Sequence, residues 1–149
     1  MDDGALVNTL NKDRTDNYQL FLAEPLHVLL VEDNVVALHF IETIMKQAGL
    51  KFTSALDGES ALELVKSNKF DLIITDIGLP GISGYQLADA IRQWEKSMHQ
   101  NPLPIIGLTA LSRCDANIES VETSINKMLF KPINLNTVQE LIRQCMYPN

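Results

Sequence analysis

Acidic residues directly follow two of the apolar runs in this 149-residue chain. Glu32 and Asp33 come after residues 27–31, and Asp76 comes where the β-branched run of residues 72–74 ends. Carboxylate oxygens without Cys or His nearby suit a hard cation, Mg²⁺ before Zn²⁺. A carboxylate oxygen can also attack a phosphoryl group and form an acyl phosphate. These residue types therefore indicate magnesium-dependent phosphoryl chemistry centred on one carboxylate.

Two further apolar runs end in residues that fit the same chemistry. Thr109 follows residues 105–108, and Lys131 follows residues 128–130. A lysine supplies a point positive charge and a threonine supplies a hydroxyl donor. Placed beside a carboxylate, both groups would stabilise a phosphoryl group in transfer.

Each of these residues also has a simpler interpretation. Asp76 can end a turn before Gly78 and Pro80, and Glu32-Asp33 can cap a helix. Thr109 and Lys131, taken singly, suit a turn threonine and a solvated lysine. The site interpretation is favoured because four separate segments present matching groups at the point where each run ends.

The apolar runs alternate with segments of helical periodicity, which predicts an α/β domain with an open, doubly wound parallel sheet. In such a sheet the carboxyl ends of the strands share one edge, where ligand chemistry is usual. Strands are expected at residues 27–31, 51–55, 105–108 and 128–130, and within the stretch 70–80 at its apolar run 72–74, with the strand at 51–55 nearer an edge. Four helices are expected between and after the strands, each with one apolar face toward the core. Their core-facing residues are, helix by helix, Leu38, Ile41, Met45 and Ala48; Ala61, Leu62 and Val65; Leu87, Ile91 and Trp94; and Leu135, Val138, Leu141, Ile142 and Cys145. A thinly apolar helix over residues 112–122 is expected to be the least firmly held.

The boundaries of the domain are predicted from composition. Residues 1–25 carry little periodicity and many Asn and Asp, which is typical of a linker or leader. The domain is predicted over residues 26–147, with a tail of residues 148–149. Its length suits one hydrophobic core.

Charge and cysteine usage narrow the class of protein. With 12 basic and 19 acidic residues the formal charge is −7, which disfavours direct nucleic acid binding. No apolar run is long enough to span a membrane. Cys114 and Cys145 lack the spacing of a metal or redox motif, so a reduced, cytoplasmic protein is expected.

Four motifs, in this order and spacing, resemble the receiver domain of two-component response regulators. They are L-L-V-E-D-N, D-L-I-I-T-D-I-G-L-P-G-I-S-G, P-I-I-G-L-T-A and F-K-P-I. The resemblance covers about residues 26–147. It implies the flavodoxin-like receiver fold, a five-stranded parallel sheet in the order 2-1-3-4-5.

The resemblance also implies a role for each candidate residue. Asp76 corresponds to the phosphoacceptor, which would take a phosphoryl group from phosphohistidine with Mg²⁺ bound. The remaining correspondences are Asp33 as direct Mg²⁺ ligand, Glu32 as its acidic companion, the Gly78 carbonyl in the metal shell, Lys131 as phosphate contact, Thr109 as switch hydroxyl and the amide of Ala110 beside it.

The resemblance implies that the chain is a signalling domain that catalyses only its own phosphorylation and the hydrolysis of its own phosphoryl group. Its implied partner is a histidine kinase dimerisation domain or a histidine phosphotransfer protein. The motifs are similar to receivers of hybrid sensor histidine kinases, although a stand-alone regulator stays open. Homodimerisation also stays open, because no clear apolar stripe supports it.

The chain departs from the family pattern at two places. Met128 stands where an aromatic residue is common, so a flexible thioether would replace a rotating ring. Thr123-Ser124 replaces the usual small-Gly pair. An alternative is a receiver-like module that works without phosphorylation. A flavin or nucleotide site is disfavoured because the acidic Glu32-Asp33 loop would repel phosphate, and a phosphatase would want an acidic residue at Gly78.

Overall fold

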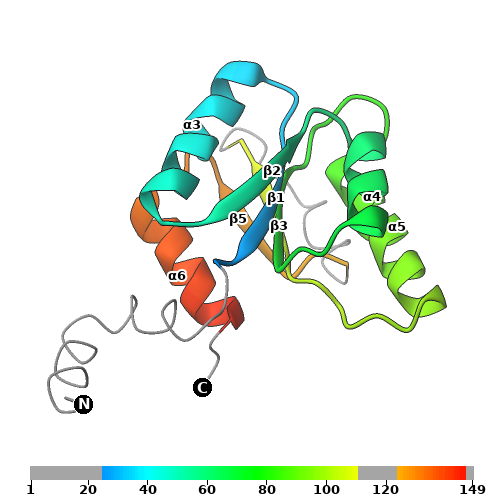
Figure 1. The fold of residues 1–149 in the computed structure, drawn as a ribbon. Helices are drawn as coiled ribbons and strands as arrows, with labels where there is room; N and C mark the ends of the chain where they lie inside the picture. Colours follow the sequence, from blue (N-terminus) through cyan, green and yellow to red (C-terminus); the bar gives the residue numbers. More distant parts are fainter. Residues whose placement is uncertain (1–24, 111–123, 147–149) are drawn as a thin grey trace, which may run out of the picture.

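The computed structural model describes residues 25–110 and 124–146, which build one five-stranded parallel sheet with helices on both faces (Figure 1). The strands lie in the order β2-β1-β3-β4-β5, and every pairing is parallel. The predicted doubly wound fold and strand order are therefore confirmed. The strands are β1 (His27–Val31), β2 (Lys51–Ala55), β3 (Leu72–Asp76), β4 (Ile105–Thr109) and β5 (Lys127–Phe130). The helices of the described part are α3 (Val35–Gln47), α4 (Gly58–Ser67), α5 (Gly84–Ser97) and α6 (Leu135–Met146).

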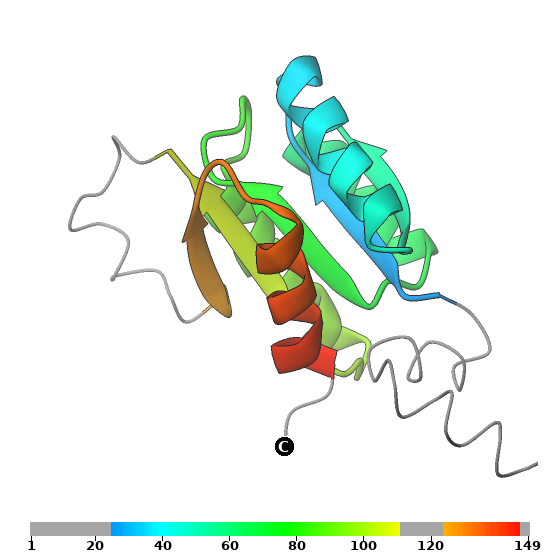
Figure 2. The same ribbon diagram turned by 90° about the vertical axis from the view of Figure 1, so that its left-hand side faces the viewer.

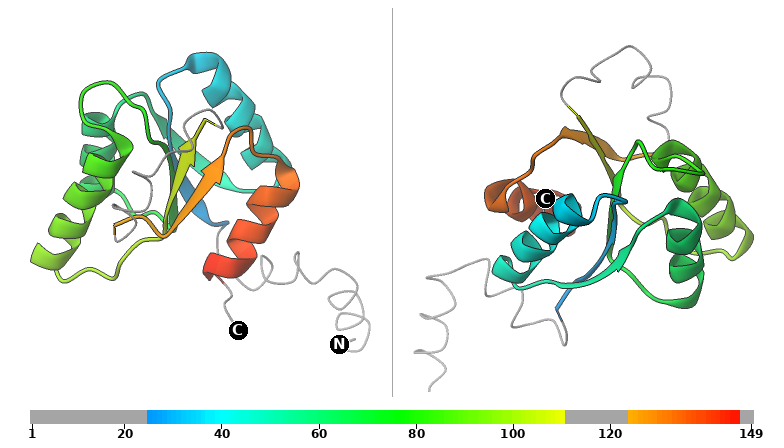
Figure 3. Two further views of the ribbon diagram at one scale, coloured as in Figure 1. Left: turned by 180° about the vertical axis from the view of Figure 1, so that it is seen from behind. Right: turned by 90° about the horizontal axis from the view of Figure 1, so that it is seen from above.

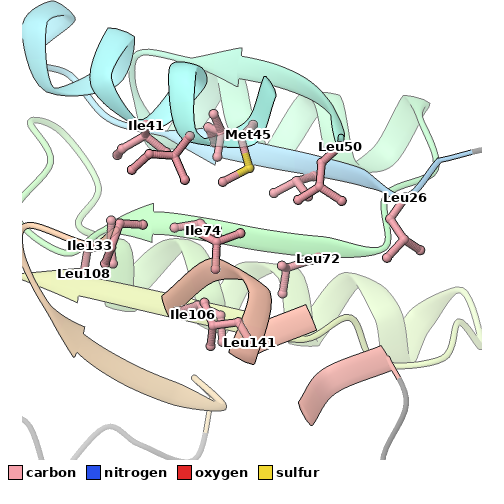
Figure 4. Close-up of a cluster of buried hydrophobic side chains, with 14 of the residues drawn as sticks. Leu26, Ile41, Met45, Leu50, Leu72, Ile74, Ile106, Leu108, Ile133 and Leu141 are labelled. Carbon is pink, nitrogen blue, oxygen red and sulfur yellow. The ribbon is translucent and has the colours of Figure 1, made fainter. Parts of the chain in front are cut away.

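The helices are divided between the two faces of the sheet. Seen from above, α3 and α6 lie on one side and α4 and α5 on the other (Figure 3). Figure 2 views the molecule with α3 and α6 in front of the sheet. Each helix layer encloses its own hydrophobic cluster, as a two-sided parallel sheet requires. Figure 4 shows the cluster beneath α3 and α6, where Met45 lies near Ile41 and Leu50.

Burial follows the position of each strand in the sheet. Every residue of β3 and β4 is buried, and β1 is buried after its half-buried first residue. The outer strands β2 and β5 are more exposed. The edge position predicted for the second strand is thus confirmed. The central strands cannot move without opening the core, so they form a rigid base for the residues at their carboxyl ends.

Local sequence signals explain where the helices begin and end. Asn34, Asp57 and Ser83 each accept a hydrogen bond from a backbone N–H of the first turn, and Ser83 and Gln86 form a reciprocal capping box. Asn134 accepts from the Thr137 N–H at 2.9 Å and so caps the first turn of α6.

The inward positions predicted for these helices are buried or half-buried, with Ala48, Leu62, Trp94, Leu135, Ile142 and Cys145 in the half-buried group. Gly49 has a φ of 75° after α3, a backbone conformation that favours glycine.

Several predictions fall on residues that the structure does not describe. They are the leader, the helix over residues 112–122, Cys114 and Thr123. No helix among residues 25–110 and 124–146 is long and apolar enough to cross a membrane.

Candidate functional site

The candidate site lies at the carboxyl edge of the sheet, where the ends of four strands meet. The arrowheads of β4 and β5 point to this edge in Figure 3. Asp76 is the last residue of β3 and Thr109 the last of β4, while Glu32 and Lys131 directly follow β1 and β5. The Lys131 N–H donates to the Thr109 carbonyl at 2.8 Å, which continues the β4–β5 pairing to the edge.

Lys131 connects two of the carboxylates. Its Nζ donates a hydrogen bond to Glu32 Oε1 at 2.8 Å and lies 3.1 Å from Asp76 Oδ1. The side chain of Glu32 is only 2% exposed and that of Asp76 12% exposed, whereas Lys131 is 29% exposed. Buried carboxylates need such a cation, since an unpaired buried charge is strongly destabilising.

The pKa of Lys131 reflects this environment. Burial acts to lower the pKa of its ammonium, but the hydrogen bonds to Glu32 and Asp76 and the charges of both carboxylates outweigh burial. The pKa of Lys131 is therefore raised above 10.5. Lys131 is a permanent cation at neutral pH.

Glu32, Asp33 and Asp76 form a group suited to a cation. One carboxylate oxygen from each residue lies within 4.8 Å of the others. Carboxylate oxygens gathered this closely could act together on one hard cation. Glu32 and Asp76 are buried while Asp33 is exposed, which leaves one side open to solvent. An oxygen-only donor set of this charge fits Mg²⁺.

The three polar residues of the loop after β1 make different contacts. The second oxygen of Glu32 accepts the Asn34 N–H at 3.1 Å, so this carboxylate is held from both sides. Asn34 in turn accepts the Ala37 N–H at 2.9 Å and begins α3. Asp33, between them, faces solvent. Local hydrogen bonding thus orients the acidic pair.

The backbone of Asp76 is held by its neighbours. The buried Thr75 hydroxyl donates to the Asp76 carbonyl at 2.9 Å. The first residue of α5, Gly84, approaches so closely that an added Cβ would lie 2.5 Å from the same carbonyl oxygen. The Gly84 N–H donates to the Ile77 carbonyl at 2.9 Å. The chain after β3 therefore folds back tightly, and Asp76 has little freedom of main-chain movement.

The structure brings most of the predicted site residues together. Direct contacts join Lys131 to Glu32 and Asp76, and Asp33 belongs to the same acidic group. Thr109 is 5% exposed at the same edge. Gly78 is exposed shortly after Asp76, and the half-buried Ala110 follows Thr109.

An exposed apolar surface beside the acidic group was not predicted from the sequence. Val35 is 64% exposed, Val36 77% and Phe40 50%, all in α3 immediately after the acidic loop. Leu56, 49% exposed, follows β2 at the same edge. For Val35, Val36 and Phe40 the signal in the sequence was that they stand outside the stripe of α3 that faces the core. Large apolar side chains gathered around a polar site are typical of a surface that binds a protein.

The fold and the acidic edge together define a signalling domain of two-component systems. The family model for the response regulator receiver domain matches residues 28–143. The chain belongs to this family, as the resemblance implied.

Relatives and solved structures agree with this assignment. The chain is 31% identical over 134 residues to the sensor histidine kinase GacS of Pseudomonas protegens, and the match covers 90% of this chain and 15% of that protein. The receiver domain of sensor histidine kinase PA1611 from Pseudomonas aeruginosa superposes with a TM-score of 0.72 at 29% identity, covering 82% of this chain and 98% of that one. That structure has a magnesium ion coordinated in its active-site cleft.

A second solved structure shows a receiver with a partner. The receiver domain of the Saccharomyces cerevisiae response regulator Ssk1, in complex with the histidine phosphotransfer protein Ypd1, has a TM-score of 0.72 at 28% identity. The match covers 81% of this chain and 89% of that one.

Proposed function

We propose that this chain is a phosphoacceptor that takes a phosphoryl group from a phosphohistidine onto Asp76. The observation that carries the proposal is the ion-paired acidic group itself. Asp76 is fixed at the end of a buried central strand, 3.1 Å from the Lys131 ammonium and grouped with two further carboxylates. Folding alone does not explain three carboxylates grouped at one edge, since like charges held together repel.

The transfer is a substitution at phosphorus. One carboxylate oxygen of Asp76 forms a bond to the phosphorus atom while the phosphorus–nitrogen bond to the imidazole breaks. The electron pair of that bond returns to the imidazole nitrogen, and Asp76 becomes an acyl phosphate. Lys131 would stabilise the phosphoryl oxygens by charge. Thr109, the last residue of β4, and the amide of Ala110 directly after it would offer hydrogen bonds.

Glu32, Asp33, Asp76 and the carbonyl of Gly78 would hold Mg²⁺. The ion would supply positive charge to the phosphoryl oxygens during transfer. Lys131 already neutralises part of the carboxylate charge, so the residues of this chain lower the repulsion that an incoming phosphoryl group meets.

The apolar surface of Val35, Val36, Phe40 and Leu56 supports a protein donor. These side chains are exposed next to the acidic group, where a partner must approach to bring a histidine to Asp76. We infer that the partner is a histidine kinase dimerisation domain or a histidine phosphotransfer protein that presents an apolar helical surface. The hybrid-kinase relative and the receiver solved with a phosphotransfer protein support this class of partner.

The proposal is tested by measuring intact mass after incubation with acetyl phosphate and Mg²⁺. The parent chain is expected to gain one phosphoryl group, and Asp76→Asn none. Removal of Mg²⁺ with a chelator is expected to abolish the gain. Labelling of Asp76→Asn to the level of the parent would contradict the assignment. Failure of the parent to be labelled or to bind Mg²⁺ would favour a module that works without phosphorylation.

A further inference from the structure

Thr75 carries a buried hydroxyl in the central strand β3 that the proposed transfer does not use. Its side chain is 0% exposed, and the residue pairs with Val31 of β1 and with Gly107 of β4. A buried hydroxyl costs free energy unless it is hydrogen-bonded, and the branched side chain of valine would fill the same space without a polar atom. Packing of the core therefore gives no reason for a hydroxyl at this position.

The Thr75 hydroxyl is hydrogen-bonded to the backbone of the proposed phosphoacceptor. Its Oγ1 donates to the carbonyl oxygen of Asp76 at 2.9 Å. The same oxygen is approached by Gly84, the first residue of α5, where an added Cβ would lie 2.5 Å from it. The hydroxyl and the start of α5 thus both restrict the position of this oxygen.

The Asp76 carbonyl belongs to the peptide plane that joins Asp76 to Ile77. At the other end of this plane, the Ile77 N–H donates to the Leu108 carbonyl of β4 at 3.0 Å. The plane is therefore held at its oxygen by the Thr75 hydroxyl and at its nitrogen by the neighbouring strand. Because the Cα of Asp76 lies in the same plane, its orientation helps to set the direction of the Asp76 side chain.

We propose that the hydroxyl of Thr75 positions the Asp76 carboxylate for attack on the phosphoryl group. This inference rests on the proposed function. A reacting group must be held to about 0.5 Å, and hydrogen bonds around it supply that restraint. Without the hydroxyl the peptide plane can tilt, and the carboxylate oxygen spends less time in its place 3.1 Å from the Lys131 ammonium. Thr75 is a positioning residue, since its hydroxyl bonds the backbone and takes no part in the chemistry.

The test compares Thr75→Val, which removes only the hydroxyl, with Thr75→Ser, which keeps it. Thr53→Val is the matched control, because Thr53 is a half-buried strand residue whose Oγ1 lies 2.7 Å from His27 Nε2 in the middle of β2. Labelling by acetyl phosphate is followed by intact mass at saturating Mg²⁺ over a series of acetyl phosphate concentrations, under conditions in which urea unfolding shows every variant to be folded.

The maximal labelling rate of Thr75→Val is expected to fall about 10-fold, with the half-saturating acetyl phosphate concentration within about twofold of that of the parent. A lower maximal rate at unchanged saturation is the result expected when the nucleophile is misplaced and donor binding is intact. Thr75→Ser is expected to keep the rate within about threefold of the parent, and Thr53→Val to match the parent.

Amide hydrogen exchange, measured by NMR without any phosphoryl donor, reports on the peptide plane directly. In Thr75→Val the Ile77 amide is expected to exchange about fivefold faster than in the parent. The Ile73 amide, which donates to the Pro104 carbonyl earlier along β3, is the internal reference and is expected to keep its rate. Equal acceleration at Ile73 and Ile77 would overturn the inference, because the substitution would then weaken the whole strand.

The outcomes separate this inference from the proposed function. If the parent is labelled and Thr75→Val reaches the same maximal rate, the inference is overturned and the proposed function stands. A fall in Thr75→Ser as large as that in Thr75→Val would also overturn the inference, because the hydroxyl would not be the group that matters. If the parent itself is not labelled, the proposed function fails, and the inference with it.

Discussion

The ammonium of Lys131 and the carboxylate of Glu32, 99 residues apart in the chain, form a hydrogen-bonded ion pair at 2.8 Å. The pair joins the loop after β1 to the residue after β5, across the strand that carries Asp76. Lys131 therefore serves two purposes. It stabilises the fold around a buried acid, and it brings positive charge to the oxygen that we propose accepts the phosphoryl group.

Lys131→Met is expected to lower the free energy of unfolding by about 2 kcal/mol at neutral pH, because Glu32 loses its cation. The folded pKa of Lys131 is raised, so its contribution is full below pH 10.5 and is lost as the pH rises through that higher folded pKa. The parent should therefore lose stability in this alkaline range more steeply than the variant. Urea unfolding at a series of pH values checks this.

Lys66→Met, at an exposed lysine in the last turn of α4, is the control for loss of a surface charge. It is expected to change stability by less than about 0.5 kcal/mol. Equal alkaline slopes for the parent and Lys131→Met would contradict the stabilising role of the pair.

Gly84→Ala and Gly107→Ala are expected to differ in severity. A Cβ at Gly84 would meet the backbone, 2.5 Å from the Asp76 carbonyl oxygen and 2.8 Å from Ile77 Cα. A Cβ at Gly107 would meet the ends of side chains, one of them the flexible Met128. Gly84→Ala should therefore cost about 3 kcal/mol or more and reduce labelling by acetyl phosphate, whereas Gly107→Ala should cost about 1–2 kcal/mol.

Thermal unfolding and intact mass measure both effects. Combining Gly107→Ala with Met128→Ala should cost less than the sum of the single changes, since the added methyl group then occupies space that the thioether has left. Strict additivity of the two changes would argue against the packing described for Met128.

Arg92→Met is expected to destabilise the fold by about 3 kcal/mol without affecting phosphorylation. The Arg92 guanidinium pairs at 2.9 Å with Glu95, whose side chain is only 5% exposed, and it also donates to the Ser124 carbonyl and to Asn126. Loss of the guanidinium would leave the Glu95 carboxylate buried without its cation. Chemical denaturation gives the change in stability, and labelling by acetyl phosphate gives the function.

Arg143→Met provides a matched control. Arg143 pairs with Glu140 at 3.0 Å with the same spacing along a helix, but the two side chains are 66% and 49% exposed. Its loss should cost less than about 0.5 kcal/mol, because exposed ion pairs contribute little. Similar costs for the two arginines would show that burial of Glu95 does not govern the effect.

The double substitution Val36→Ser and Phe40→Ser is expected to slow phosphoryl transfer from a protein donor but not from a small-molecule donor. The change removes apolar contact area from the exposed surface of α3 and adds no charge. Transfer from a phosphorylated histidine phosphotransfer protein that labels the parent should fall about 10-fold, which corresponds to about 1.4 kcal/mol of lost binding. Labelling by acetyl phosphate should stay within about twofold, as followed by intact mass.

Met98→Ser is the control for loss of an exposed apolar residue away from the site. The Met98→Ser variant should be labelled by the phosphotransfer protein and by acetyl phosphate at the same rates as the parent. A parallel fall of the two labelling rates in the α3 variant would mean that the substitutions disturb Asp76 and not the binding of the donor.

The order of elements and the grouping of the candidate site residues at one edge of the sheet could be predicted from the sequence because both depend on local patterns. Apolar runs that alternate with helical periodicity required parallel strands, and parallel strands bring their carboxyl ends to one edge. Glu32, Asp76 and Lys131 were predicted as a group for this reason, since each directly ends a run or follows one.

Only the tertiary structure decided how these residues share their contacts. The Lys131 ammonium bonds Glu32 as well as Asp76, and the Arg92 guanidinium donates to the Ser124 carbonyl and to Asn126, which no spacing in the chain could reveal. Strand register likewise placed Phe130 beside Thr109 and Met128 over Gly107. These relationships arise between segments that are distant in sequence, because packing and hydrogen bonding across strands depend on the relative position of whole elements and not on local preference.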